Sequence, residues 1–254
     1  MKEERYFYVP QAGQRDTLPD EEAQHALKVL RLKEGAEVFL MDGDGTFFRA
    51  EVTLATNHVC QYHIIETLPQ QRPWRGSITI AMAPTKMMER TEWFVEKATE
   101  IGVDEIVFLN CRFSERRQIK IPRIEKICIA AMKQSRKAWM PRITDMQDFD
   151  TFVRNTHHAH RYIAHCYDGE RHHLFHQLAS LPDAEKDRDV VVLIGPEGDF
   201  SIDEVKMAMQ NEFIPVTLGN SRLRTETAAL VATHIFSLVY GQRSTAKPYN
   251  RITV

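Results

Sequence analysis

Two glycine-containing loops near the C-terminus hold the residues best suited to chemistry. The first runs over Leu193–Ser201 (LIGPEGDFS) and the second over Leu218–Ala228 (LGNSRLRTETA). Each loop follows an apolar, strand-like run, contains glycine and a carboxylate, and leads into a helical pattern. In a parallel sheet, such loops bring strand ends, backbone amides and helix N-termini together. The pattern predicts a crevice for an adenine-containing ligand. The sequence has neither GxxxxGKS/T nor GxGxxG spacing in these loops, which excludes the common nucleotide-phosphate sites.

The two loops also resemble those of a known family, the bacterial 16S ribosomal RNA uridine-N3 methyltransferases of the SPOUT (trefoil-knot) superfamily. The family patterns read approximately GPEGGFS and LGxRILRTETA. Further matches lie upstream, at His25–Leu32, Lys86, Arg90, Glu100–Val103 and Gln134–Arg136. In this order the matches cover nearly the whole chain, so the resemblance concerns the entire protein and not one motif.

The N-terminal part of the 254-residue chain is β-rich. Aromatic and β-branched runs predict strands at 6–9, 38–41, 47–54 and 61–67. Apolar residues at helical spacing predict one helix over 20–30. A Pro-rich linker at 69–73 ends this region. The resemblance implies that residues 1–72 form a small PUA-like β-barrel domain that docks RNA.

The remainder of the chain alternates short apolar strands with helices, which predicts an α/β domain with a parallel sheet. The predicted strands are 78–83, 106–109, 161–166, 190–194 and 216–218. The predicted helices are 90–101, 122–138, 172–181, 201–211 and 225–240, the fourth starting at a capping box from Ser201 to Glu204. The resemblance implies that residues 73–242 form a SPOUT trefoil-knot methyltransferase domain. Residues 243–254 are expected to be a polar C-terminal tail.

Composition and residue spacing bear on where the protein works and on whether it holds a metal. The chain has 43% hydrophobic residues, no apolar run long enough for a membrane span and no signal-peptide pattern at its charged N-terminus. Its four cysteines are far apart and form no CxxC, which favours buried free thiols in a reducing cytoplasm. Seven histidines fall within residues 157–176, and His172 and His176 have i, i+4 spacing. No HExxH or paired cysteines accompany them, so we expect no metal site.

A basic segment is the predicted RNA surface. The formal net charge of −2 gives no global sign of nucleic-acid binding, yet residues 112–142 contain ten basic side chains against Glu115 and Glu125. Trp139 is placed to stack on a base. The predicted RNA contacts, partly from the segment and partly from the resemblance, are Arg31, Lys86, Arg90, Arg112, Arg116, Arg117, Lys133, Arg136 and Arg142.

The resemblance implies that S-adenosyl-L-methionine (SAM) binds in the two glycine loops. Backbone amides and carbonyls would contact the adenine, and apolar side chains would enclose it. The cofactor-binding residues carried over in this way are Ile194, Gly195, Pro196, Glu197, Gly198, Leu218, Gly219, Leu223, Arg224, Thr225, Glu226, Thr227 and Ala228.

Methylation of uracil N3 requires loss of the N3 proton, because only the deprotonated nitrogen has a free in-plane lone pair. A base or a cation that stabilises the uracil anion would serve. Arg224 is the predicted cation, and Glu197 or Glu226 the predicted base. Both glutamates also suit a purely structural role beside a helix start.

The sequence departs from the family pattern at two loop positions. Asp199 stands where a second glycine is usual, and Ser221 replaces the arginine expected two residues after Gly219. If position 199 needs a left-handed backbone, aspartate tolerates it better than most residues.

The resemblance implies a homodimer that acts on 16S ribosomal RNA in the small ribosomal subunit, and the final helix is a predicted packing element. Two alternatives remain open. One is a methyltransferase of the same fold acting on another ribosomal or transfer RNA base. The other is a non-catalytic RNA-binding assembly factor.

Overall fold

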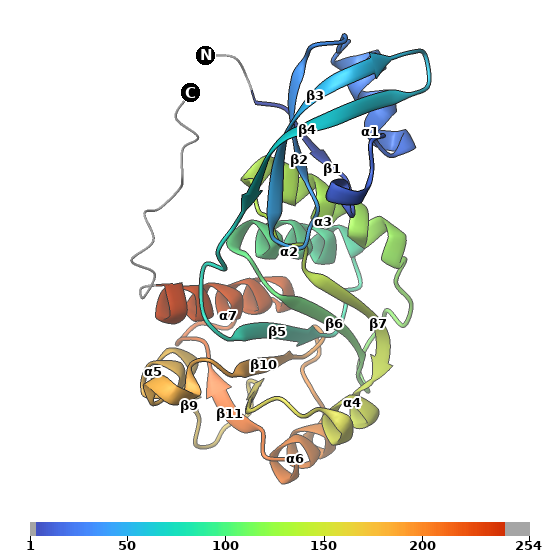
Figure 1. Ribbon diagram of the computed structural model, residues 1–254. Helices are drawn as coiled ribbons and strands as arrows, with labels where there is room; N and C mark the ends of the chain where they lie inside the picture. Colours follow the sequence, from blue (N-terminus) through green and yellow to red (C-terminus); the bar gives the residue numbers. More distant parts are fainter. Residues whose placement is uncertain (1–3, 242–254) are drawn as a thin grey trace. The chain divides into compact units, whose positions relative to one another are not determined.

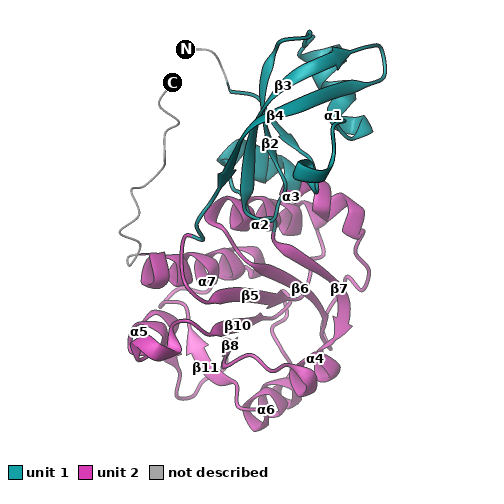
Figure 2. Ribbon diagram, in the orientation of Figure 1, with its two compact units in different colours: residues 1–72, 129–140 teal, residues 73–128, 141–254 magenta. Residues whose placement is uncertain are grey.

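The computed structural model describes residues 4–241, and the predicted tail at 243–254 lies outside this range. The described chain divides into two compact units (Figure 2). The first comprises residues up to Arg72 together with Ile129–Met140, and the second comprises Pro73–Cys128 and the chain from Pro141 onward. A segment from the middle of the sequence therefore packs with the N-terminal unit.

The first unit is built on a four-stranded sheet with the order β1-β2-β3-β4. Its strands are β1 (Tyr6–Tyr8), β2 (Glu37–Met41), β3 (Thr46–Ala55) and β4 (Cys60–Pro69). β1 pairs with β2 in parallel, and the two remaining pairs are antiparallel. Alternating strand residues such as Leu40, Phe48 and Val52 are buried against helix α1 (Asp20–Gln24) and its π-helical continuation over His25–Val29. The opposite face is covered in part by the segment Ile129–Met140, because Met41 and Phe47 pack with Met132 and Ala138.

The second unit contains a seven-stranded sheet in which every pairing is parallel, with the order β7-β6-β5-β10-β8-β11-β9. The strands are β5 (Ser77–Met82), β6 (Glu105–Asn110), β7 (Arg142–Asp148), β8 (His160–Ala164), β9 (His172–His173), β10 (Asp189–Ile194) and β11 (Ile214–Thr217). The helices are α2 (Met88–Ile101), α3 (Ile121–Ser135), α4 (Phe149–Asn155), α5 (Leu174–Ala179), α6 (Ile202–Gln210) and α7 (Thr225–Tyr240). The end of α3 belongs to the first unit.

Helices cover both faces of this sheet, with α2 and α7 on one side and α4 and α6 on the other (Figure 1). The central strands are therefore apolar throughout: all residues of Val190–Ile194 are buried. Strand residues such as Val191 and Leu193 pack with Phe152 of α4 and Ala208 of α6. Since all seven strands are parallel, their carboxyl ends lie at one edge of the sheet and their amino ends at the other.

Most predicted elements are present, and four predictions need correction. Strand β7 and helix α4 were not predicted, the helix predicted at 122–138 ends at Ser135, and the helix predicted at 172–181 is the short strand β9 followed by α5. His172 therefore lies in a strand, and its spacing to His176 is not helical. Cys60, Cys111 and Cys128 are buried as expected, whereas Cys166 is exposed. The trefoil knot implied by the resemblance stays a prediction.

Candidate functional site

Three loops enclose a crevice at the carboxyl edge of the parallel sheet. They follow β8, β10 and β11, which lie close together in the strand order. The crevice has one hollow of about 780 Å³ and a second of about 290 Å³, and the two share the lining residues Ala164, Cys166, Asp199, Arg222, Leu223 and Ala228. The larger volume is within the range of small-molecule sites, about 300–1,000 Å³, and the smaller is at its lower limit. The order of strands thus creates a site that joins segments about sixty residues apart.

The predicted cofactor residues line this crevice, with two exceptions. Ile194, Gly195, Pro196, Glu197, Arg224 and Thr225 line the smaller hollow, Gly198, Leu218 and Gly219 line the larger one, and Leu223 and Ala228 line both. Glu226 and Thr227 are not among the lining residues of either hollow. Their place in the first turn of α7 puts Glu226 behind the crevice wall, where it is only 7% exposed.

The glycines of the two loops serve different geometric purposes. A Cβ at Gly195 would lie 3.0 Å from Phe200 N, so this glycine permits a close approach of the chain to itself. Gly219 has φ +141°, a conformation that disfavours side chains. Gly198 has neither constraint. The left-handed residue of the first loop is instead Asp199, at φ 68°, which matches the expectation for aspartate at this departure from the family pattern.

Asp199 connects two of the three loops. Its Oδ2 accepts the Cys166 N–H at 2.8 Å, and its Oδ1 accepts the Phe200 N–H at 2.8 Å. Burial raises the pKa of the Cys166 thiol, and the nearby Asp199 carboxylate adds to the effect. Burial also lowers the pKa of His165. Because glycine has no carboxylate, this bridge between the β8 and β10 loops depends on the unusual residue.

Sequence reasoning missed the contribution of the β8 loop. Ala164, His165, Cys166, Tyr167 and Arg171 all line the larger hollow, together with Asp199, Ser221 and Arg222 from the two recognised loops. The loop after β8 also has a glycine between two carboxylates, Asp168-Gly169-Glu170, so a local signal of the same kind was present and was not used. The predicted strand at 161–166 was a second signal, because its carboxyl end would meet the other strand ends in a parallel sheet.

Five charged residues line the smaller hollow, namely Arg90, Glu197, Asp199, Arg222 and Arg224. Arg224 is the N-cap residue of α7, is exposed, and lines the hollow together with Arg90 and Glu197. The Glu226 Oε1 lies 3.9 Å from Arg90 Nε, whereas its Oε2 is buried without a hydrogen-bond partner among the residues that the structure describes. Glu197 Oε1 accepts the Lys86 N–H at 2.8 Å. Arg224 and Glu197, the predicted cation and one predicted base, therefore line the smaller hollow. Glu226, the other predicted base, lies directly behind its wall.

The rim beside this wall is formed by the loops after β5 and β6. Arg116 donates through Nη2 to the Lys86 carbonyl at 2.8 Å and through Nε to the Thr85 carbonyl at 3.3 Å. The Lys86 Nζ lies 2.7 Å from Glu115 Oε2, and this hydrogen bond raises the pKa of Lys86. Arg112 and Arg117 are exposed on the same loop as Arg116. Five predicted RNA contacts, including Arg90, are thus brought to one edge of the second unit.

The other predicted RNA contacts are not part of this rim, which the loops after β5 and β6 form. Lys133 and Arg136 belong to the first unit, where they pair with Glu22 and Glu4 at 2.8 Å. Arg31 also lies in the first unit, with a left-handed backbone at φ 52°. In addition, the Arg72 guanidinium carbon lies 4.1 Å from the centroid of the Trp139 ring, which was the predicted stacking residue.

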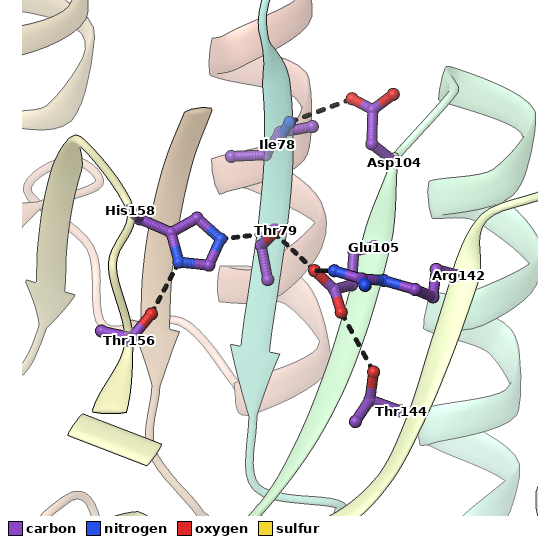
Figure 3. Close-up of polar contacts among 8 residues, drawn as sticks. All are labelled: Ile78, Thr79, Asp104, Glu105, Arg142, Thr144, Thr156 and His158. Carbon is purple, nitrogen blue, oxygen red and sulfur yellow. Dashed lines mark hydrogen bonds and ion pairs between the residues drawn. The ribbon is translucent and has the colours of Figure 1, made fainter. Parts of the chain in front are cut away.

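Arg142 lies at the amino edge of the sheet, opposite the crevice (Figure 3). Its Nη2 donates to Glu105 Oε2 at 2.7 Å. The buried Glu105 carboxylate also accepts hydrogen bonds from Thr79 Oγ1 at 3.1 Å and Thr144 Oγ1 at 3.0 Å. His158 contacts the same Thr79 hydroxyl through Nε2 at 3.0 Å, and burial lowers its pKa. We refer to Thr79, Glu105, Arg142, Thr144, Thr156 and His158 as the amino-edge network.

Two further properties bear on the class of protein. No helix within residues 4–241 is long and apolar enough to cross a membrane. Over the same residues, no group of three or more His, Cys, Asp or Glu side chains is placed to hold a metal ion.

A small β-sheet unit, a parallel sheet covered by helices and a crevice at the strands' carboxyl ends define an α/β protein built to hold a nucleotide-like ligand. Comparison with known families makes this specific. Residues 72–237 match the model of the RNA methyltransferase domain, and residues 18–61 match that of the RNA methyltransferase PUA domain. The chain belongs to the RNA methyltransferase family that these two domains define. The predicted fold class, a PUA-like β domain followed by an α/β parallel-sheet domain, is confirmed.

Individual relatives are similar in sequence to this chain over most of their length. The chain is 44% identical to a Porphyromonas gingivalis protein described as a probable rRNA-methyltransferase, with a TM-score of 0.83 and coverage of 94% of this chain and 99% of that one. A Legionella pneumophila protein described as a methyltransferase, solved with bound SAM, is 27% identical with a TM-score of 0.80, covering 93% and 98%. The ribosomal RNA small subunit methyltransferase E of Rickettsia conorii is 26% identical over 217 residues, covering 84% and 85%.

Proposed function

We propose that this protein transfers a methyl group from SAM to N3 of a specific uridine in 16S ribosomal RNA of the small subunit. The observation that supports this most strongly is the crevice itself: Glu197 and Arg224, from the loops after β10 and β11, line one hollow together with Arg90 of α2. The names of the relatives point to small-subunit ribosomal RNA. The choice of uridine N3 follows from the resemblance in the glycine loops.

The lining of the crevice fits the cofactor. Apolar side chains of Ile194, Leu218 and Leu223 offer walls for an adenine ring, and strand-end backbone groups offer hydrogen bonds. Nothing lies within 4 Å of the place where a Cβ of Gly219 would be, so the backbone there is open to a ligand. The carboxylates of Glu197 and Asp199 suit the positive charge of the cofactor. When bound, SAM supplies an electrophilic methyl group with its own leaving group, so the protein has only to orient and desolvate the reactants.

The side chains at the hollow can prepare uracil N3 for attack. Arg224 would stabilise the negative charge that develops on the uracil ring when N3 loses its proton. Glu197 is the better placed base, because its carboxylate is exposed and lines the hollow, with one oxygen fixed by the Lys86 N–H. Glu226 lies behind the wall beside Arg90, and we assign it to holding that arginine in place.

RNA would approach along the cationic rim of the second unit. Lys86, Arg112, Arg116 and Arg117 offer phosphate contacts, which position a nucleic acid without reading its sequence. Arg31, Lys133, Arg136 and Arg142 remain predicted contacts, with the last three already paired to carboxylates.

We further propose a homodimer. Helices α2 and α7 pack against each other and expose large apolar side chains, Trp93 at 42% and Leu238 at 42%. Such side chains are costly to leave in water and suit an interface between copies. Light scattering of the purified protein would give the mass directly, and a monomer would contradict this assignment.

The central test uses small ribosomal subunits from cells that lack this activity. The subunits are incubated with the protein and methyl-labelled SAM, and the RNA is digested to nucleosides. We expect labelled 3-methyluridine from 16S RNA. Another labelled nucleoside, or label only on transfer RNA, would replace the proposed target with a different base. Cofactor binding without any label, on subunits, naked RNA or transfer RNA, would favour a non-catalytic RNA-binding factor.

A further inference from the structure

Phe113 is an aromatic side chain held in water beside the crevice. It is 47% exposed and lies in the loop between β6 and α3, between the exposed Arg112 and the buried Ser114. Isolated exposed apolar residues are common in folded proteins and need no special explanation. Phe113 differs from such residues in its surroundings. Its loop is fixed by hydrogen bonds and lies beside Gly198 of the first glycine loop.

A tight turn fixes the backbone on both sides of Phe113. Ser114 N donates to the Cys111 carbonyl at 3.0 Å, and Cys111 N donates to Ser114 Oγ at 3.0 Å. Arg112 N donates to Glu204 Oε1 at 2.8 Å, and Glu204 is only 7% exposed. The other oxygen of Glu204 is engaged by Ser201 in the capping box of α6. A buried, fully engaged carboxylate thus connects the Phe113 turn to the helix that follows the first glycine loop.

The ring lies next to the first glycine loop. A Cβ built on Gly198 would be 3.4 Å from Phe113 Cβ and 4.0 Å from Cδ2 of its ring. Gly198 itself lines the larger hollow, and its neighbours Glu197 and Asp199 line the smaller one. Phe113 is therefore at the border of the crevice, on the side where the loop with Arg112, Arg116 and Arg117 begins.

We propose that Phe113 is a stacking platform for an unpaired RNA base next to the reacting uridine. The inference rests on the proposed function and identifies how the RNA is held there. A base that reaches a crevice must leave its helical stack, and aromatic side chains beside cationic ones compensate for the lost stacking. Phe113 provides the ring, and Arg112 and Arg117, both exposed, provide cations for the adjacent phosphates.

The charge of the loop favours RNA over a second protein surface. Residues 111–120 contain four basic side chains and one acidic one, Glu115, which is paired with Lys86. An apolar contact with another protein copy would be expected where charged residues are depleted, which is not the case in this loop. Trp139, the stacking residue expected from the sequence, already has the Arg72 guanidinium over its ring.

The first test measures binding of a fluorescein-labelled, uridine-containing single-stranded RNA of roughly 16 nucleotides. Phe113→Ala should weaken its binding at least about 10-fold, since base–aromatic stacking is worth about that factor or more. Affinity for SAM, measured by calorimetry, should stay within about twofold. Phe175→Ala is the matched control: Phe175 is 38% exposed and lies on α5, not on the cationic loop beside Gly198, so its removal should leave both affinities unchanged.

Two further readouts separate stacking from charge and from dimerisation. Phe113→Trp should retain binding, and the added tryptophan should show fluorescence quenching by RNA beyond that of the wild type. The dependence of log K on log salt should keep its slope in Phe113→Ala, while Arg117→Ala should reduce the slope by about 0.7. Wild-type affinity in Phe113→Ala, or loss of binding that follows loss of dimer in light scattering, would overturn the proposal.

A different set of results would show that the proposed function itself is wrong. If wild-type protein neither labels small subunits nor binds the RNA, the methyltransferase assignment fails and the assignment of Phe113 fails with it. If the wild type labels subunits normally and Phe113→Ala labels them with the same KM and kcat, only the stacking role is overturned. The expected result is a raised KM for subunits in Phe113→Ala, with restoration by tryptophan.

Discussion

The two edges of the seven-stranded sheet treat polar groups in opposite ways. At the amino edge, the Glu105 carboxylate receives three hydrogen bonds, and His158 bonds Thr79 and Thr156 through its two ring nitrogens (Figure 3). At the carboxyl edge, Arg224 is exposed, and one oxygen of Glu226 is buried without a partner in the described chain. The amino edge has satisfied its polar groups internally, whereas the carboxyl edge leaves Arg224 exposed at the crevice and one oxygen of Glu226 unpaired behind its wall.

We infer from this difference that the amino edge mainly stabilises the fold, whereas the carboxyl edge mainly serves function. Buried polar groups that are fully bonded fix the packing of the strands, and their loss leaves costly unpaired atoms. Polar groups that line an open crevice contribute little to folding and remain available to a ligand. We therefore expect substitutions at the carboxyl edge to reduce activity with small changes in stability, and substitutions at the amino edge to do the reverse.

The largest expected effect is at Arg224. Arg224→Ala should reduce methyl transfer to small subunits at least about 100-fold, because it removes a cation from the developing uracil anion. Its side chain is exposed, so the free energy of unfolding should change by less than about 0.5 kcal/mol. Turnover is measured with labelled SAM, and unfolding with urea. Near wild-type turnover would remove Arg224 from the chemistry, and a large loss of stability would contradict the contrast between the edges.

The opposite edge is tested by Glu105→Ala. Loss of this buried carboxylate leaves the Thr79 and Thr144 hydroxyls without their acceptor, and we expect a loss of about 2–3 kcal/mol in unfolding free energy. Glu197→Ala is the matched control, an exposed glutamate whose removal should cost less than about 0.5 kcal/mol. Urea denaturation of both variants gives the comparison. Equal losses would mean that the two edges do not differ as the hydrogen bonds indicate.

Elements whose local sequence agrees with their final environment could be predicted. The buried strand Val190–Ile194 is apolar throughout, and the capping box at Ser201 and Glu204 marks the start of α6 within one residue. Strand β7 is the outermost strand on one side of the sheet. It has the polar sequence RITDMQD, so it lacks the apolar run of a central strand. Helix α4 has only seven residues, too few for a periodic pattern to emerge.

The candidate site could be predicted only as far as its loops carry local signals. Glycine and carboxylate mark the loops after β10 and β11, and both were found. The loop with His165 and Cys166 also contains glycine between carboxylates, at Asp168-Gly169-Glu170, and was missed because its place in the crevice depends on β8 pairing with both β10 and β11. The amino-edge network was missed for a similar reason: Thr79 and His158 are 79 residues apart and meet only in the folded sheet.

A smaller effect is expected at Asp199, where the carboxyl edge depends on a departure from the family pattern. Asp199→Gly suits the left-handed backbone at φ 68° but removes the carboxylate that accepts the Cys166 N–H. Looser attachment of the β8 loop should weaken SAM binding about fivefold, or about 1 kcal/mol. Calorimetric titration measures this, and Asp199→Asn, which keeps one acceptor oxygen, should lie between glycine and wild type. Unchanged affinity in the glycine variant would show that the bridge does not organise the crevice.

The smallest effect is a pH dependence at the amino edge. Burial lowers the pKa of His158, with Arg142 and Arg161 acting in the same direction and Asp189 and Glu105 opposing it. Because the pKa in the folded state lies below the unfolded value of about 6.5, the unfolded protein binds more protons as the pH falls. The stabilisation is complete above about pH 7 and is lost as the pH falls through the folded pKa.

We expect the contribution of His158 to the free energy of unfolding to decline as the pH falls from 8 to 5. The measurement is the difference in unfolding free energy between wild type and His158→Asn at each pH. This difference cancels the other titrating groups, including His165 at the carboxyl edge, whose pKa is also lowered by burial. A constant difference would show that His158 is not held neutral by its burial, and the amino edge would then be less fully closed to protons than its hydrogen bonds indicate.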